Sequence, residues 1–234
     1  MKNNGFTLIE MSLVLVVIGL ILGAVSIGKD MQRNAVYLKA NSQFIHGWVN
    51  AYQEYYDRTG IVLGDDEFNP TLEVNGKNRV THPIHGVSLR REICGSDLHE
   101  LMDSAGIEMP QGRAEGQEDK FVYLDTNGNP QELNVCFKNI PWAVSASGGY
   151  VQRQKNVLYL KNVTPDLARM IDHSVDNVTD ARFGKVREYY ANVDLGSGSK
   201  EWHIDNTYAY GENTSSNLDE SQVVVTHLYY IMNQ

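Results

Sequence analysis

The sequence has few of the residue patterns that build catalytic or metal centres. Its two cysteines stand far apart, and no His-Glu-x-x-His motif is present, so the ligand spacing of a zinc site is lacking. His82 and His85 are three positions apart, but zinc needs two further ligands. Residues 145–149, Ser-Ala-Ser-Gly-Gly, fit neither a phosphate loop nor a nucleophile elbow. No catalytic base stands beside a nucleophile, and we predict that the protein is not an enzyme.

Basic residues are also scarce. The 234 residues include 20 Lys and Arg against 29 Asp and Glu, for a formal net charge of −9, and the longest basic run is Arg90-Arg91. Nucleic-acid binding depends on clustered Lys and Arg that neutralise phosphates, so nucleic acid is not an expected partner. With 42% apolar residues, the chain can form one folded domain and still carry an anchor.

An uncharged, strongly apolar segment stands near the N-terminus. Residues 11–28 carry no charge and are mostly Leu, Val and Ile. At ~1.5 Å of rise per residue, such a helix is just long enough to cross the ~30 Å hydrocarbon core of a bilayer. A secretory signal peptide would place its small cleavage-site residue after the apolar segment, whereas Gly5 precedes it. An ordinary membrane anchor leaves the costly carboxylate of Glu10 unexplained, and a buried core helix is rarely this long and apolar.

The residues Gly-Phe-Thr-Leu-Ile-Glu at positions 5–10, with the apolar segment after them, resemble the N-terminus of type IV pilin and pseudopilin precursors. The resemblance implies that residues 1–5 are a leader peptide and that a prepilin peptidase cuts between Gly5 and Phe6. Phe6 would become the N-methylated first residue of the mature protein, and Glu10 would become the fifth. The direct match covers about the first 30 residues.

The processed N-terminus has a physical logic. Cleavage gives Phe6 a positive α-amino group beside an apolar helix, and this charge needs a counter-charge in a low-dielectric surrounding. We predict that Glu10 of a neighbouring copy supplies it during assembly and sets the register between subunits. The alternative is a carboxylate that reaches the membrane surface without a partner. Gly19, Gly23 and Gly28 can loosen the helix in place of the proline that many pilins carry, and a smooth helix is the alternative.

The helix is predicted to continue beyond the membrane. Aromatic and apolar residues recur in three- and four-residue steps after residue 30, which places them on one helical face, and Gly60 follows as a stop signal. We therefore predict a helix over residues 6–58, transmembrane over about 9–28, and a globular head over 59–234. The aromatic face is expected to pack into the core of the head. Its residues are Tyr37, Asn41, Phe44, Ile45, Trp48, Tyr52 and Tyr55.

The rest of the chain has mixed helix and strand patterns. Strands are predicted over residues 120–124, 132–137, 157–161, 185–191 and 222–231, with a turn over 125–130. Helices are predicted over residues 95–105, capped by Ser96, and from Thr164 onward, with Pro165 in the first turn. Residues 65–85 and 197–216 have the composition of loops. The predicted fold class is α+β, and the resemblance implies a long helix packed on a mainly antiparallel sheet, as in pilin heads.

The two cysteines are predicted to form a disulfide if the head is exported, since an oxidising compartment favours a single pair and pilin heads often carry one. A bridge between Cys94 and Cys136 would add ~4 kcal/mol to stability in the chain-entropy estimate. The alternative is a reduced, buried thiol at Cys136, which lies in a predicted strand.

We predict no cofactor, with calcium as the alternative at two places. Asp125, Asn127 and Asn129 offer oxygen atoms at alternate positions, as a calcium loop does, but the twelfth position is Cys136 rather than Glu, and a hairpin turn fits better. The second place is a set of acids spaced by four, which on a helix would line one face. A solvated helix end is the other interpretation of that set. It consists of Asp172, Asp176 and Asp180.

The resemblance implies a structural role. We expect a subunit of a type IV pilus-like filament, held in the bacterial inner membrane by a single span with its head in the periplasm, and then built into a filament. Its partners would be copies of itself or other pilins, the prepilin peptidase, an inner-membrane assembly platform, and membrane lipid before assembly. The alternatives are a pseudopilin of type II secretion and a minor pilin at the filament tip that acts in adhesion or DNA uptake.

Overall fold

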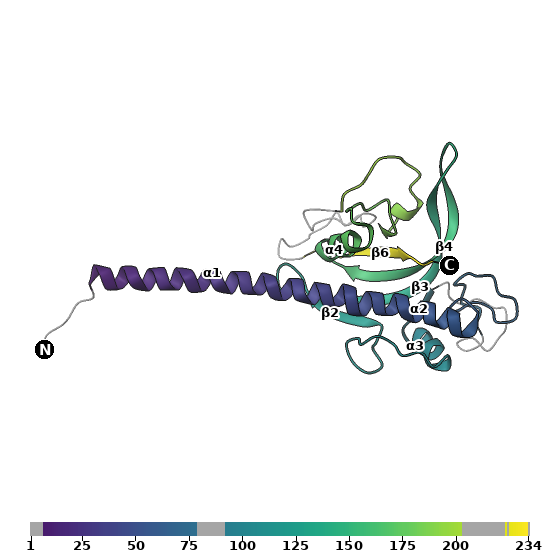
Figure 1. Ribbon diagram of the computed structural model, residues 1–234, viewed down its shortest axis with the longest axis horizontal. Coiled ribbons are helices and arrows are strands. Elements are labelled where there is room, and N and C mark those ends of the chain that lie inside the picture. The colour runs from purple at the N-terminus through teal and green to yellow at the C-terminus, as the bar shows by residue number, and fades with distance from the viewer. Residues whose placement is uncertain (1–6, 79–91, 203–222, 224, 234) are drawn as a thin grey trace, which may run out of the picture.

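The computed structural model describes residues 7–78, 92–202, 223 and 225–233. A long N-terminal helix dominates the molecule (Figure 1). It consists of α1 (Leu8–Lys39), a π-helical segment η1 (Ala40–Ile45) and α2 (His46–Thr59). The helix ends at Gly60, whose φ of 71° lies in the left-handed region that glycine adopts without strain. The end agrees with the predicted boundary to within one residue, and α1 runs without a break through Gly19, Gly23 and Gly28.

The π-helical segment is a departure from the single regular helix that the sequence predicts. A π-helical turn holds one residue more than an α-helical turn, so η1 brings two adjacent rows of side chains to the head. Asn41 uses this position to donate a hydrogen bond from Nδ2 to Oγ of Ser174, at 2.8 Å. The side chains of η1 that are buried against the head are Ala40, Asn41, Phe44 and Ile45.

The head is built around one antiparallel sheet in the order β1-β3-β4-β6-β5, and β2 also pairs with β3. Two long strands form its centre, and they are longer than the sequence predicts. Their hairpin closes where Ala146 pairs with Gly149, so residues 147–148 form a tight two-residue turn. The strands are β1 (Glu92–Cys94), β2 (Lys120–Leu124), β3 (Pro130–Ala146), β4 (Gly149–Val163), β5 (Val186–Glu188) and β6 (Thr226–Ile231).

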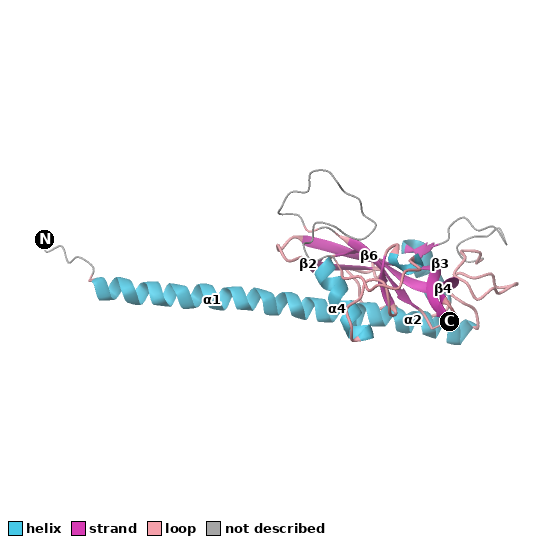
Figure 2. Cartoon of the chain, turned by 90° about the horizontal axis from the view of Figure 1, so that it is seen from above, coloured by secondary structure: helices cyan, strands magenta, loops and turns pink. Residues whose placement is uncertain are grey.

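The long helix packs its aromatic face on the sheet, as predicted. The ring of Phe44 lies 5.2 Å from that of Phe121 in β2, and Tyr52 stacks on Phe137 of β3 at 5.1 Å between ring centroids. Trp48 meets the same Phe137 edge-on at 6.3 Å. Figure 2 shows that α2 runs along the head while most of α1 extends beyond it. The prediction of an α+β fold, with a long apolar helix and an antiparallel sheet in a pilin-like arrangement, is confirmed.

Two shorter helices cover other parts of the core, and their starts test the capping predictions. α3 (Gly95–Ser104) begins directly after β1 with Cys94 at the cap, so the prediction of Ser96 as the cap residue is wrong. The chain leaves the strand at the cysteine, and Gly95 takes the φ of 53° that the sharp turn requires. α4 (Pro165–Asp176) begins as predicted, with Thr164 at the cap and Pro165 in the first turn.

The last two strands of the sheet are shorter than the sequence predicts. Strand β5 covers three residues of the predicted segment 185–191, because the chain turns at Tyr190, where φ is 67°, into a 3-10 turn η2 (Ala191–Val193). Strand β6 covers the second half of the predicted segment 222–231. Most of the predicted loop 197–216 lies outside the described residues.

Candidate functional site

The first described residues close the start of α1 with a reciprocal pair of hydrogen bonds. Oγ1 of Thr7 accepts a hydrogen bond from the backbone N–H of Glu10 at 3.3 Å, and the Glu10 carboxylate accepts one from the backbone N–H of Thr7 at 2.8 Å. The Thr7 hydroxyl also donates to the same carboxylate oxygen, Oε2, at 2.8 Å. This is a capping box, and it satisfies amide groups that would otherwise lack a partner at a helix start.

Sequence reasoning missed this second role of Glu10, although the spacing Thr-x-x-Glu at positions 7–10 is the signal for it. The cap uses Oε2 alone, and Oε1 makes no hydrogen bond to any residue that the structure describes. The carboxylate therefore has one oxygen in its own helix and one directed to no described group. Gly5 and Phe6, the predicted cleavage and methylation positions, lie outside the described residues.

The helix surface after Glu10 is apolar and uncovered. From Leu8 to Ile27, the large apolar side chains are between 45% and 92% exposed. Among the described residues, Leu8–Thr59 is the one helix long and apolar enough to cross a membrane by length and composition, with a mean hydropathy of 2.7 in its most apolar window. A Cβ built on Gly19 or Gly23 would meet nothing within 4 Å, so the small residues make no contact inside this molecule. Such a surface needs lipid or other helices around it.

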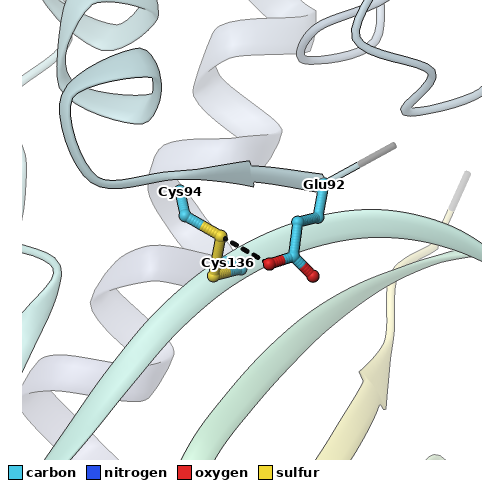
Figure 3. Close-up of side chains that lie close together, drawn as sticks. All are labelled: Glu92, Cys94 and Cys136. Atoms are coloured by element: carbon cyan, nitrogen blue, oxygen red, sulfur yellow. Dashed lines mark hydrogen bonds between the residues drawn. A yellow bond between two sulfur atoms is a disulfide. The ribbon is translucent and has the colours of Figure 1, made fainter. Parts of the chain in front are cut away.

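The two cysteines form the predicted disulfide, which joins β1 to β3 in the head. Cys94 stands directly opposite Cys136 in the strand register, with their Cα atoms 4.5 Å apart. Glu92 extends toward the same sulfur atoms (Figure 3), and its carboxylate pairs with Nζ of Lys161 at 2.5 Å. Three potential ligand residues therefore lie together, but disulfide sulfurs lack the thiolate charge that binds metals. The cluster is a structural bridge with an ion pair beside it.

The first predicted calcium position is occupied by a hairpin turn, which was the preferred interpretation. Oδ1 of Asp125 accepts hydrogen bonds from the backbone N–H groups of Asn127 and Asn129, at 2.9 and 2.8 Å. Oδ2 of Asp125 accepts a third, from the side chain of Gln131 at 3.0 Å. The Asp125 carboxylate thus stabilises the β2–β3 turn by accepting hydrogen bonds from amide groups of nearby residues, as Asp commonly does in turns.

The acids at 172, 176 and 180 do not line one helix face, and the interpretation as a helix end fits better, although Asp172 is buried rather than solvated. α4 ends at Asp176, because Asn177 adopts φ of 61°, and Asp180 lies beyond the helix. Each carboxylate accepts hydrogen bonds from backbone amides of the segment that follows. Asp176 accepts from the N–H of Lys185 at 2.7 Å, and Asp172 accepts from the N–H of Asp180 at 2.8 Å. The three acids fix the path of the chain after α4.

Asp172 is the most buried of these acids. Its Oδ2 also accepts a hydrogen bond from Nε1 of Trp202 at 2.7 Å, while Oδ1 is buried and has no hydrogen-bond partner among the described residues. Burial raises the pKa of Asp172 to about 7, and the hydrogen bonds from Trp202 and Asp180 oppose the rise. A neutral carboxyl group is favoured here because removing a charge from water is costly.

The sheet face opposite the long helix carries a feature that the sequence did not indicate. Nζ of Lys138 lies 3.9 Å from the ring centroid of Tyr159 and 4.8 Å from that of Tyr229. Burial lowers the pKa of Lys138 to about 8, and the nearby Glu92 opposes the change. These residues come from three strands and meet only through the sheet register. Their contact therefore cannot be predicted from the spacing of residues within one segment. The predicted pair His82 and His85 lies outside the described residues.

Comparison with known proteins identifies one segment of the chain. Residues 1–26 match the family model of the prokaryotic N-terminal methylation motif. No curated protein and no solved structure matched the chain. The matched segment contains the Thr7–Glu10 cap and most of the uncovered apolar helix, which places the methylation motif at the start of that helix.

Proposed function

We propose that this chain, whose N-terminal methylation motif is typical of type IV pilins and pseudopilins, is a structural subunit of a type IV pilus-like filament. The motif and the pilin-like α+β architecture imply a pilin or pseudopilin that is processed by a prepilin peptidase and anchored in the inner membrane before assembly. In the proposal, cleavage falls between Gly5 and Phe6, Phe6 is N-methylated, and the head stands in the periplasm.

The observation that carries the proposal is the uncovered apolar surface of α1. It lies entirely beyond the head, on a helix that is held rigidly to the sheet by its other half. When such helices pack together and exclude water, each Å² of apolar surface contributes ~25 cal/mol. In lipid the same surface is already solvated by hydrocarbon, so that gain is largely absent. The filament therefore has to be assembled by a machine that extracts the helix from the membrane.

Glu10 has a defined task in this assembly. Its free oxygen, Oε1, accepts a hydrogen bond from the methylated amino group of Phe6 of a neighbouring copy, while Oε2 stays in the cap of its own helix. A charge pair in the helix core is favoured only when its geometry is good, so the pair selects one register among many apolar contacts.

The test is the chemical state of the N-terminus in the mature protein. We expect mass spectrometry of the protein isolated from membranes to give a chain that begins at Phe6 and carries one added methyl group on its amine. A variant with Gly5→Ala is expected to keep residues 1–5, because the peptidase acts after that glycine. Retention of Met1 in the wild-type protein, or a cut beyond Ala24 that removes the apolar helix, would refute the proposal.

A further inference from the structure

A cleft of about 480 Å³ lies where α1 leaves the head. One wall is the helix, with Lys29, Arg33 and Val36 on the face that looks toward the sheet. The other wall is the β2–β3 turn, with Leu124 and Thr126. Figure 1 shows this end of the head lying toward the exposed half of α1. The next turn of the helix closes the cleft on the head side, because Tyr37 packs edge-on against Tyr123 at 5.8 Å.

The cleft lies at the level of lipid headgroups. The uncharged segment ends at Gly28, and the residues of the helix wall begin at Lys29. At ~1.5 Å of rise per residue, the helix wall extends only ~10 Å from the edge of the hydrocarbon core. The headgroup region of a bilayer leaflet has a similar thickness of roughly 5–8 Å. This placement follows from the membrane-anchored state, so the inference rests on the proposed function.

The charges in the cleft are incompletely paired. Nη2 of Arg33 lies 3.3 Å from Oδ1 of Asp30, which leaves most of the guanidinium donors for another acceptor. Lys29 forms no ion pair with any residue in the part of the chain that the structure describes. The acid on the opposite wall, Asp125, accepts hydrogen bonds on both of its oxygens from other groups, and among the described residues it forms no ion pair with Lys29 or Arg33.

The cleft also has apolar residues beside its cations. The side chain of Leu124 is 47% exposed at the end of β2, and Val36 lines the helix wall at partial burial. An apolar side chain beside two cations is the pattern expected where a phosphate joins a glycerol and its acyl chains. A small soluble anion has no apolar part that could pack against Leu124 and Val36.

We propose that this cleft binds the headgroup of a glycerophospholipid of the outer leaflet. Lys29 and Arg33 hold its phosphate by charge-assisted hydrogen bonds, and Asp30 faces the ammonium of an ethanolamine headgroup. Leu124 covers the glycerol. Bound in this way, the lipid fixes the height and rotation of the head above the membrane before assembly, and it must be released when the helix is extracted.

The experiment places the full-length mature protein in nanodiscs of phosphatidylethanolamine. A trace of the same lipid carries a photoreactive group at the top of one acyl chain, and peptide mapping locates the cross-links. We expect cross-links concentrated on residues 29–36 and 124–128. The double variant Lys29→Gln/Arg33→Gln is expected to reduce them roughly tenfold, as loss of charge-assisted bonds to phosphate requires. Thr126→Trp, which fills the cleft without changing charge, is expected to reduce them as well.

A matched control separates the cleft from general attraction to the membrane. Lys39→Gln removes one charge from the same helix, outside the cleft, and is expected to leave the cross-links unchanged. Equal labelling of the double variant and the wild type, or even labelling around the helix, would overturn the inference. Loss of labelling in millimolar inorganic phosphate would mean that the cleft takes a soluble anion instead. If cross-links are missing from residues 11–27 too, the chain is not inserted, and the proposed function itself fails.

Discussion

At the scale of single residues, Glu10 has two roles, and a substitution that removes its whole carboxylate would disturb both at once. Its carboxylate caps α1 through Thr7, and its charge is proposed to pair with the amino group of the next copy. Glutamine can replace glutamate in a capping box but carries no charge. Thr7→Ala has the opposite effect, because it removes the hydroxyl of the cap and keeps the acid. The two variants therefore separate the cap from the charge.

We expect Glu10→Gln to abolish or strongly reduce filament formation, although the start of the helix keeps its hydrogen bonds. Thr7→Ala is expected to weaken the helix start by about 1 kcal/mol and to reduce filaments only mildly. The measurement is the amount of filament recovered by shearing, set against the amount of processed subunit in the membrane. Filaments of Glu10→Gln at the wild-type level would show that the charge has no part in register.

Asp172 makes the stability of the head depend on pH. Its pKa is raised from 3.8 in the unfolded chain to about 7 in the folded protein. Between these two pH values the folded state binds more protons than the unfolded state, so this residue's contribution is complete below pH 4 and is lost as pH rises through about 7. The amide of Asp172→Asn keeps an oxygen for the N–H of Trp202 and does not titrate.

We therefore expect wild-type protein to lose stability relative to Asp172→Asn as pH rises from about 4 to 7, by on the order of 3 kcal/mol. Urea denaturation of both proteins across this range in detergent gives the difference. Asp103→Asn, at an exposed position of α3, serves as the control and should show no such trend. A constant gap between wild type and Asp172→Asn at all pH values would contradict the assignment.

At the scale of elements, η1 acts as an insertion of one residue into a long α-helix. A π-helical turn accommodates an extra residue while the flanking helices keep their orientation. Deletion of Ser42, an exposed residue of η1, should therefore restore a regular helix with Trp48 and Tyr52 still on the sheet. Deletion of Asn50, exposed in α2, would instead rotate Tyr52 away from Phe137, because no spare residue exists there.

We expect the Ser42 deletion to change the unfolding free energy by about 1 kcal/mol or less, and the Asn50 deletion to cost several times more. Circular dichroism during thermal unfolding, with tryptophan fluorescence as a second probe, measures both. If the two deletions cost the same, η1 does not contain a residue in excess of a regular α-helix.

The disulfide secures an edge of the sheet that has little else to hold it. Strand β1 has only three residues, and α3 follows it directly with Leu98, Leu101 and Met102 in the core. Replacing both cysteines with alanine is expected to cost ~4 kcal/mol by the chain-entropy estimate. Hydrogen exchange should show the largest loss of protection in β1 and α3, beyond the smaller loss that the lower global stability causes in β4 and β6. Uniform loss of protection across the sheet would contradict a local role for the bridge.

Local patterns in the sequence predicted the elements well where one residue type controls the geometry. Gly60 ended the helix and Thr164 with Pro165 began α4, since their backbone preferences need no tertiary partner. Register and neighbours across strands were not predictable in this way. Neither the length of β3 nor the meeting of Lys138 with Tyr159 follows from one segment alone.

At the scale of the whole molecule, the exposed half of the long helix was predictable from local patterns, whereas contacts between the helix and the head were not. The long apolar helix of the exposed half of α1 was predictable, because hydropathy and length favour such a helix without reference to the head. The cleft beside Lys29 and Arg33 was not, because the β2–β3 turn reaches the helix only in the folded head. The spacing of the acids at 172, 176 and 180 allowed either one helical row or a helix end, and the structure shows that α4 ends at Asp176 with Asp180 beyond it.

The exposed apolar half of the long helix makes no part of the described core, so we predict that the head folds stably without it. Among the described residues, the buried core begins at Tyr37, and the large exposed apolar residues of the helix are concentrated before Gly28. A chain that starts at Lys29 keeps the described core and loses the exposed apolar segment. We expect it to be monomeric and soluble without detergent, with the unfolding midpoint of the full-length protein.

A chain that starts at Ser42 is the matched control. It loses Tyr37, which packs on Tyr123, together with the buried Ala40 and Asn41, so a loss of about 3 kcal/mol or more is expected. Sedimentation analysis gives the oligomeric state of each truncated chain, and thermal unfolding gives its stability. Because lipid or neighbouring helices solvate only the first half of the helix, the longer fragment has no reason to be less stable than the intact protein. An early unfolding transition of the Lys29 chain would show that the anchor also supports the fold of the head.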